Sequence, residues 1–206
     1  EESHIRSTES ALGDWIADRM LDTFRGCGAQ AAFVNSGSLR LYQDLPPGSD
    51  ILRRHIEELF AFPAPVYQLR IDGRTLQQVV EHAIDYWPGA GNWLQVAGLG
   101  FDHDTRNGRV SNLRLLGPDG WRPVLPDETL KVLANLYLFD KTGDRDGFTM
   151  LHFDQIDPDC ALNAHNYDLK SDIVIPALRA AGSIAPHVDG RIRQDPPPAA
   201  VNLCGD

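Results

Sequence analysis

The order of its sequence patterns predicts an α+β domain in which helices pack on a mixed β-sheet. Helical and strand patterns alternate up to about Tyr86, and from Trp93 onward strand patterns follow one another with turn residues between them. The chain has 206 residues, of which 42% are hydrophobic and 23% charged, so one domain with a substantial core is expected. We expect this domain to span residues 1–193 and the proline-rich residues 194–206 to form a disordered tail.

The first helices and the first strand follow from periodicity and capping residues. Apolar residues recur every four positions from Leu12 onward, which predicts a helix over residues 10–25. The apolar residues 31–34 predict a short buried strand. A second helix is expected to begin at an N-cap formed by Ser49 or Asp50 and to end before the prolines that follow it.

A strand, a turn and a helix are expected next. Residues 66–71 predict the strand, Asp72-Gly73 the turn, and Thr75 the N-cap of a helix that continues to about Tyr86. Strand signals then dominate as far as the last predicted helix. The strongest of them are the turn sequence Asn107-Gly108 and the apolar run 130–138.

These strand signals predict an antiparallel meander. A further turn is expected at Gly117-Pro-Asp-Gly120, between two strand-like segments. The last helix is expected over residues 167–181. Helices before and after a run of strands support the α+β prediction.

The charge balance excludes broad classes of partner. The chain has 29 acidic and 19 basic residues and a net charge of -10. Such a charge repels nucleic acid polymers and anionic lipid surfaces, whereas a few well-placed arginines can still hold a small anionic ligand. No apolar run approaches the length of about 18 residues that a membrane helix needs. The first residues do not form a basic-then-apolar signal peptide.

The cysteines offer no metal site. Cys27, Cys160 and Cys204 are an odd number of thiols without metal-ligand spacing. At most one internal disulfide can form among them, and we expect no cysteine chemistry.

A series of short motifs occurs in one order along the chain. These motifs are Arg6–Asp18, Asn35–Arg40, Leu94–Gly98, Asp144–Phe148 and Asp189–Ile192. Together they resemble the C-terminal domain of the 5'-nucleotidase, UDP-sugar hydrolase and 2',3'-cyclic phosphodiesterase family, and the resemblance covers nearly the whole chain. It implies that this domain binds the nucleotide or nucleoside, while a separate N-terminal metallophosphoesterase domain with two divalent metal ions performs the hydrolysis. It also implies a periplasmic or secreted location.

The loop from Asn35 to Arg40 directly follows a predicted strand, where ligands commonly approach. The resemblance implies that Asn35 supplies a donor and an acceptor, that Gly37 allows close approach, and that Arg40 offers a planar guanidinium to phosphate and ribose oxygens. Without the resemblance, the same residues fit an ordinary turn with a solvated arginine.

The resemblance implies two further polar contacts. Arg6 precedes Gly13 at the distance from which an arginine reaches the ligand in the family. Asp146 aligns with the aspartate of the family's G-G-D-G-[FY] loop and would accept hydrogen bonds from two ribose hydroxyls. Taken alone, Arg6 fits a solvated arginine and Asp146 an acidic turn. The spacing of a calcium-binding EF-hand is missing around Asp146.

An aromatic clamp for the base is also implied by the resemblance. Phe62, in Phe60-Ala-Phe-Pro63, corresponds to the phenylalanine of the family's L-P-F-G stretch, and Tyr137 to the aromatic residue of its N-x-[FY] element. Two aromatic rings that stack on the faces of a base contribute about 1–3 kcal/mol per base. The alternative is that both rings belong to the core.

The chain lacks the residues of a phosphoesterase metal site. Gly13-Asp-Trp-Ile-Ala-Asp18 is similar to the G-D-x-x-D pattern of such sites, with one more residue between the aspartates, but it falls within a predicted helix, where family members carry a similar G-N-x-I-A-D. Two-metal hydrolysis needs several converging ligands, and the chain has no D-x-H, G-N-H or H-x-H sequence. We therefore expect no catalytic residue and no metal ligand in this chain, and His82 to be structural.

Two functions are weighed on this basis. The first is a substrate-recognition domain of a 5'-nucleotidase-like hydrolase, which is not catalytic by itself. The second is a binding or interaction module that kept the fold but lost nucleotide recognition. The prolines around Phe62 and the expanded loop around Asp146 favour the second, and the full set of motifs favours the first.

Overall fold

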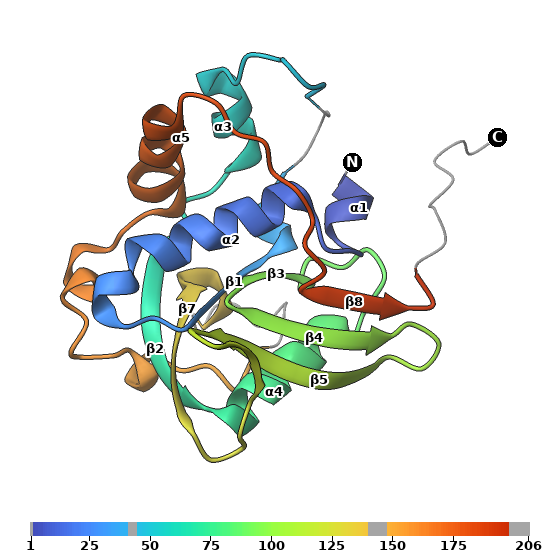
Figure 1. The fold of residues 1–206 in the computed structure, drawn as a ribbon. Helices are drawn as coiled ribbons and strands as arrows, with labels where there is room; N and C mark the ends of the chain where they lie inside the picture. The colour runs from blue at the N-terminus through green and yellow to red at the C-terminus, as the bar shows by residue number, and fades with distance from the viewer. Residues whose placement is uncertain (1, 41–44, 140–147, 198–206) are drawn as a thin grey trace.

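The computed structural model describes residues 2–40, 45–139 and 148–197, which form two four-stranded β-sheets with helices packed on them (Figure 1). The helices are α1 Glu2–Ile5, α2 Ala11–Thr23, α3 Arg53–Leu59, α4 Gly73–Ile84 and α5 Ile175–Ala181. The strands are β1 Ala31–Asn35, β2 Val66–Asp72, β3 Leu94–Ala97, β4 Leu99–Asp104, β5 Arg109–Gly117, β6 Gly120–Pro123, β7 Thr129–Asn135 and β8 Ile192–Asp195. The prediction of an α+β domain with mixed sheets and packed helices is confirmed.

The first sheet has the strand order β2-β7-β1-β3 and is buried on both faces. β1 pairs in parallel with β7 and antiparallel with β3, while β2 pairs antiparallel with β7. Ala31 and Phe33 of β1 face a core shared with α4 and the second sheet, whereas Ala32 and Val34 face a core shared with α2. Because successive strand side chains point to opposite faces, one strand contributes to both cores. Figure 1 shows α2 crossing this sheet.

The second sheet has the strand order β6-β5-β4-β8. β4, β5 and β6 form the predicted antiparallel meander, and its two turns contain Gly108 and Gly120 with positive φ. The meander prediction is wrong for residues 130–138, because β7 leaves it and inserts between β1 and β2 of the first sheet. In the first sheet, alternating β7 side chains pack into both cores, one on each face of the sheet.

Gly98 is the single residue between β3 of the first sheet and β4 of the second. Its φ is +64°, and a Cβ atom at this position would lie 2.3 Å from the carbonyl oxygen of Gln30. Only glycine fits both the left-handed conformation and this close approach. The glycine of the Leu94–Gly98 motif thus has a structural role.

The early helix and strand predictions are confirmed by α2, β1 and β2. Ser10 is the N-cap of α2, and its hydroxyl accepts a hydrogen bond from the backbone N–H of Gly13 at 3.1 Å. The predicted turn at Asp72-Gly73 is wrong, because Asp72 itself caps α4 and accepts a hydrogen bond from the backbone N–H of Thr75 at 2.7 Å. The helix therefore begins at Gly73, before Thr75.

The predicted N-cap of α3 is also wrong. The helix begins at Arg53 with Leu52 as N-cap, so neither Ser49 nor Asp50 caps it. The backbone N–H of Leu52 donates instead to Nδ1 of His55 at 3.2 Å. A side chain within the helix thus satisfies the backbone donor at its start.

The last predicted helix forms, but its first part has π-helical and its second part α-helical geometry. Asp168 caps a π-helical segment over Leu169–Val174, which continues into α5. Near the C-terminus, β8 pairs with β4 as far as Asp195, so the folded domain extends past the predicted boundary at residue 193. The hydroxyl of Thr105 also donates to the carbonyl oxygen of Pro196 at 2.8 Å.

Cys27 and Cys160 form a disulfide, with their Cα atoms 5.1 Å apart. The expectation of no cysteine chemistry is therefore corrected, since two of the three cysteines make a structural cross-link. Cys204 lies outside the described residues. Within the described part of the chain, no helix combines the length and apolar character needed to cross a membrane.

Candidate functional site

Most of the predicted ligand residues lie on loops at one end of the first sheet. Asn35 at the end of β1 pairs with Leu94 at the start of β3, and Val66 at the start of β2 pairs with Asn135 at the end of β7. The loops that leave β1 and β7 and those that enter β2 and β3 therefore meet at this end. The predicted residues on these loops are Gly37, Arg40, Phe62 and Tyr137.

The segment that carries Arg6 is bound to the same end of the sheet. The hydroxyl of Ser36, directly after β1, lies 2.8 Å from the carbonyl oxygen of Ile5. The backbone N–H of Gly89 donates to the carbonyl oxygen of Arg6 at 3.2 Å. Arg6 is half-buried and lies beside the loop that leads to Arg40.

Gln95, within β3, holds this N-terminal segment through its side chain. Its side-chain amide donates to the carbonyl oxygens of Ile5 and Thr8, each at 2.8 Å, and its Oε1 accepts from the backbone N–H of Ser10 at 3.0 Å. Gln95 is fully buried, so these bonds are shielded from water. The glutamine of the Leu94–Gly98 motif thus positions the segment that contains Arg6.

Two indole groups complete this anchoring. Nε1 of Trp87 donates to the carbonyl oxygen of Ser7 at 2.8 Å, and Nε1 of Trp93 donates to that of Thr8 at 3.0 Å. The sequence reasoning missed Ser36, Gln95 and both tryptophans as supports of the site. A polar residue within a short apolar strand was the signal available for Gln95.

Gly13 allows Gln95 to reach this segment. A Cβ atom on Gly13 would lie 2.4 to 2.6 Å from side-chain atoms of Gln95, including Oε1. The glycine of the first motif is therefore explained by the glutamine of the third, on an adjacent element.

Asn35 and Gly37 both contact other residues at this end of the sheet. Asn35 is fully buried, and its Oδ1 accepts hydrogen bonds from Ser38 Oγ at 2.6 Å and Asn135 Nδ2 at 3.1 Å. These bonds fix the loop after β1. The close approach at Gly37 is made by the backbone of Gly91, to which the Gly37 N–H donates at 2.8 Å.

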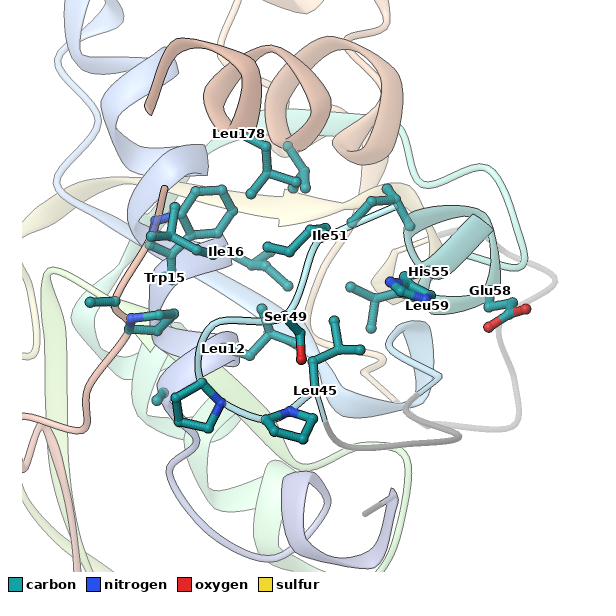
Figure 2. Close-up of a pocket in the computed structure, with 18 of the residues that line it drawn as sticks. Leu12, Trp15, Ile16, Leu45, Ser49, Ile51, His55, Glu58, Leu59 and Leu178 are labelled. Atoms are coloured by element: carbon teal, nitrogen blue, oxygen red, sulfur yellow. The ribbon is translucent and has the colours of Figure 1, made fainter. Parts of the chain in front are cut away.

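Arg40 lies on the wall of a cavity of about 770 Å³, between α2, residues 45–59 and the chain around α5. Figure 2 shows Leu12, Trp15 and Ile16 of α2 facing Ile51 and Leu59 across this space. The lining is mainly apolar and includes neither Phe62 nor Tyr137. The cavity is therefore distinct from the predicted base site.

Phe62 and Tyr137 are both open to solvent. The side chains are 67% and 44% exposed, so the alternative that they belong to the core is wrong. Their segments are joined where the backbone N–H of Leu136 donates to the carbonyl oxygen of Pro65 at 2.7 Å. Exposed apolar surface of this kind often marks a place where a ligand or partner binds.

The first and last motifs bind one another. The Glu9 carboxylate accepts from the backbone N–H groups of Asp189 at 3.0 Å, Gly190 at 2.8 Å and Ile192 at 2.7 Å. Arg191 in turn bonds to the side chain of Asp189 and holds the pKa of that carboxyl below its usual range. The Asp189–Ile192 motif therefore closes the domain onto its N-terminal segment.

Arg191 also donates a hydrogen bond to Asp18, one of the two aspartates of the Gly13–Asp18 sequence, at 2.8 Å. The other aspartate, Asp14, has a carboxyl oxygen within 4.8 Å of oxygens of Glu9 and Asp189. Asp146 lies outside the described residues.

This architecture defines an α+β domain that presents basic and aromatic side chains from loops at one end of a mixed sheet. The chain belongs to the family described as 5'-nucleotidase, C-terminal domain, whose model matches residues 1–152. The resemblance of the motifs is thereby confirmed.

Longer proteins contain a similar domain. The trifunctional nucleotide phosphoesterase protein YfkN of Bacillus subtilis (strain 168) is 25% identical over 204 residues, which cover 94% of this chain and 13% of that protein. A 5'-nucleotidase precursor from Thermus thermophilus matches in structure with a TM-score of 0.77 and 26% identity, over 94% of this chain and 37% of its own. The NAD nucleotidase of Haemophilus influenzae shares the fold, with a TM-score of 0.68, 16% identity and coverage of 90% and 33% of the two chains.

Proposed function

We propose that this domain recognises a nucleotide or nucleoside for a 5'-nucleotidase-like metallophosphoesterase. The observation that carries the proposal is the convergence of the Arg6 segment, the loop to Arg40, and the exposed rings of Phe62 and Tyr137 at one end of the first sheet. Two guanidinium groups fit phosphate and ribose oxygens, and two aromatic rings fit the faces of a base.

The residues divide into contacts and supports. Arg6, Arg40, Phe62 and Tyr137 contact the ligand, with Asp146 on the ribose hydroxyls. Asn35 and Gly37 act indirectly, because the first is buried against Asn135 and the second packs on Gly91. The loop after β1 is thereby held in one conformation, which lowers the entropy lost when Arg40 binds a ligand.

The hydrolysis belongs to another part of the protein. The chain spans 13% of the Bacillus relative and 37% of the Thermus one, so most of each relative lies outside the matched domain. We place two divalent metal ions and the reacting water in an N-terminal metallophosphoesterase domain, to which this domain delivers the phosphoester. The present chain alone is then not catalytic.

The proposed location is outside the reducing cytosol, in the periplasm or secreted. The Cys27–Cys160 disulfide supports this location, because such cross-links persist mainly in oxidising compartments.

Calorimetric titration of the chain with AMP and adenosine tests the proposal. Arg40→Ala should weaken AMP binding by about 2 kcal/mol, near thirtyfold, with little change in melting temperature. Arg25→Ala is the matched control, because Arg25 is 77% exposed and lies before the start of β1, at the opposite end of the sheet. Absence of binding by the parent chain would favour a module that kept the fold and lost nucleotide recognition.

A further inference from the structure

Asp14 is a buried carboxyl group without hydrogen-bond donors. It lies in the first turn of α2 and is 1% exposed. Among the groups in the described ranges, none donates a hydrogen bond to either of its oxygens. The guanidinium of Arg191 approaches it to 3.7 Å from Nε to Oδ2, beyond hydrogen-bond distance. An ionised carboxylate in this setting would cost several kcal/mol.

The groups that face Asp14 make a negative charge on Asp14 more costly. Carboxylates of Glu9 and Asp189 lie within 4.8 Å of it, and Asp18 shares Arg191 with Asp189. The guanidinium of Arg191 is thus the positive charge beside Asp14, Asp18 and Asp189. β3 presents only neutral groups here, the side chain of Gln95 and the carbonyl oxygen of Val96, and His187 acts on Asp189 from the preceding loop.

A proton compensates this charge better than a divalent cation does. The oxygens of Glu9 already accept three backbone N–H groups, and both oxygens of Asp189 accept from Arg191. Calcium requires about six to eight oxygen ligands, and it would lie beside the positive charge of Arg191. A proton needs a single acceptor oxygen, and it removes the repulsion between Asp14 and Glu9. Burial, opposed by the charge of Arg191 and assisted by the neighbouring Glu9, raises the pKa of Asp14 to about 8.

We propose that Asp14 is protonated and donates a hydrogen bond to Glu9, and that this pair positions the segment that bears Arg6. Glu9 joins that segment to the loop 189–192 through its three backbone contacts. Loss of the proton places two buried negative charges side by side, which weakens these contacts and loosens the segment. The part of the proposal that concerns Arg6 rests on the proposed function, whereas the shared proton does not.

The sign of the pH dependence follows from proton binding. A carboxyl whose pKa rises on folding binds more protons in the folded state than in the unfolded state between its ordinary value and the raised one. The contribution of Asp14 to the free energy of unfolding therefore falls as the pH rises from about 4 to about 8, and it is constant above that. Asp14→Asn removes the titration, while its amide can still donate to Glu9.

Melting temperatures of the parent chain, Asp14→Asn and Asp22→Asn measured from about pH 5 to about pH 9 test the pair. Asp22, on the same helix, is a surface control that pairs with Arg19 and Arg25. The melting temperature of the parent should fall relative to that of Asp14→Asn as the pH rises, and Asp22→Asn should follow the parent. A constant difference between the parent and Asp14→Asn across the range would overturn the proposal. Stabilisation of the parent but not of Asp14→Asn by millimolar calcium at the alkaline end would also overturn it.

A binding measurement tests the link to Arg6. Between about pH 7 and about pH 9 the phosphate of AMP is already doubly ionised, so its own titration does not interfere. At about pH 9 only about one tenth of Asp14 is protonated, so only about that fraction of the parent has the Arg6 segment in position. The affinity of the parent for AMP should therefore fall by about tenfold over this range, and that of Asp14→Asn should not. An equal pH dependence in both would remove the positioning role. If AMP binds neither protein at any pH, the proposed function fails, and the melting curves still decide the shared proton.

Discussion

The hydroxyl of Ser36 lies 2.8 Å from the carbonyl oxygen of Ile5. Ser36 follows β1 and belongs to the loop that ends at Arg40, whereas Ile5 immediately precedes Arg6. The hydroxyl also lies 2.8 Å from the carbonyl oxygen of Trp93, at the entrance to β3. One buried side chain therefore joins the three segments that form this end of the sheet.

Ser36→Ala should loosen this junction. The carbonyl oxygen of Ile5 keeps its bond from Gln95, so the expected loss is about 1 kcal/mol of unfolding free energy. Affinity for AMP should fall as well, because both arginines depend on the junction. Urea unfolding and calorimetry measure the two effects, with the exposed Ser111→Ala on β5 as control. Unchanged affinity in a destabilised Ser36→Ala protein would separate the junction from the site.

Gly13→Ala should destabilise the domain although it adds only one methyl group. The new Cβ would meet the buried side chain of Gln95 at 2.4 Å, which forces Gln95 away from its hydrogen bonds. Overpacking of this kind costs about 1–3 kcal/mol. Gly26→Ala is the matched control, because its Cβ would meet nothing within 4 Å. Equal unfolding free energies for the two variants would show that Gln95 accommodates the methyl group.

Phe62→Ala and Tyr137→Ala should each weaken adenosine binding by about 1–3 kcal/mol. The two losses should not be additive, because a base held on one face alone is freer to tilt. A double-mutant cycle by calorimetry measures the coupling. Trp121→Ala removes another aromatic residue, 43% exposed on the second sheet, and should leave the affinity unchanged. Additive losses would mean that the rings do not hold the same base.

Local sequence patterns were sufficient for much of the fold and for the family. The four-residue periodicity from Leu12 predicted α2, and the turn sequences predicted the hairpins of β4 to β6. The motif series identified the family and directed attention to the loops after β1 and β7. These features are readable because they depend on residues close together in the chain: the side of a helix, the conformation of a turn, the end of a strand.

The tertiary structure alone decided which segments meet and which polar groups are buried. β7 lies in the first sheet because its alternating side chains pack into two cores. The sequence of residues 130–138 does not by itself indicate that β1 and β2 are the neighbouring strands. Asn35 is buried because Asn135 and Ser38 reach it from other positions. Asp14 faces Glu9 and Asp189 because the C-terminal loop folds back onto the N-terminal segment. Burial and pairing depend on contacts between distant parts of the chain, and the free energy of those contacts is a property of the packed domain, which no single stretch of sequence contains.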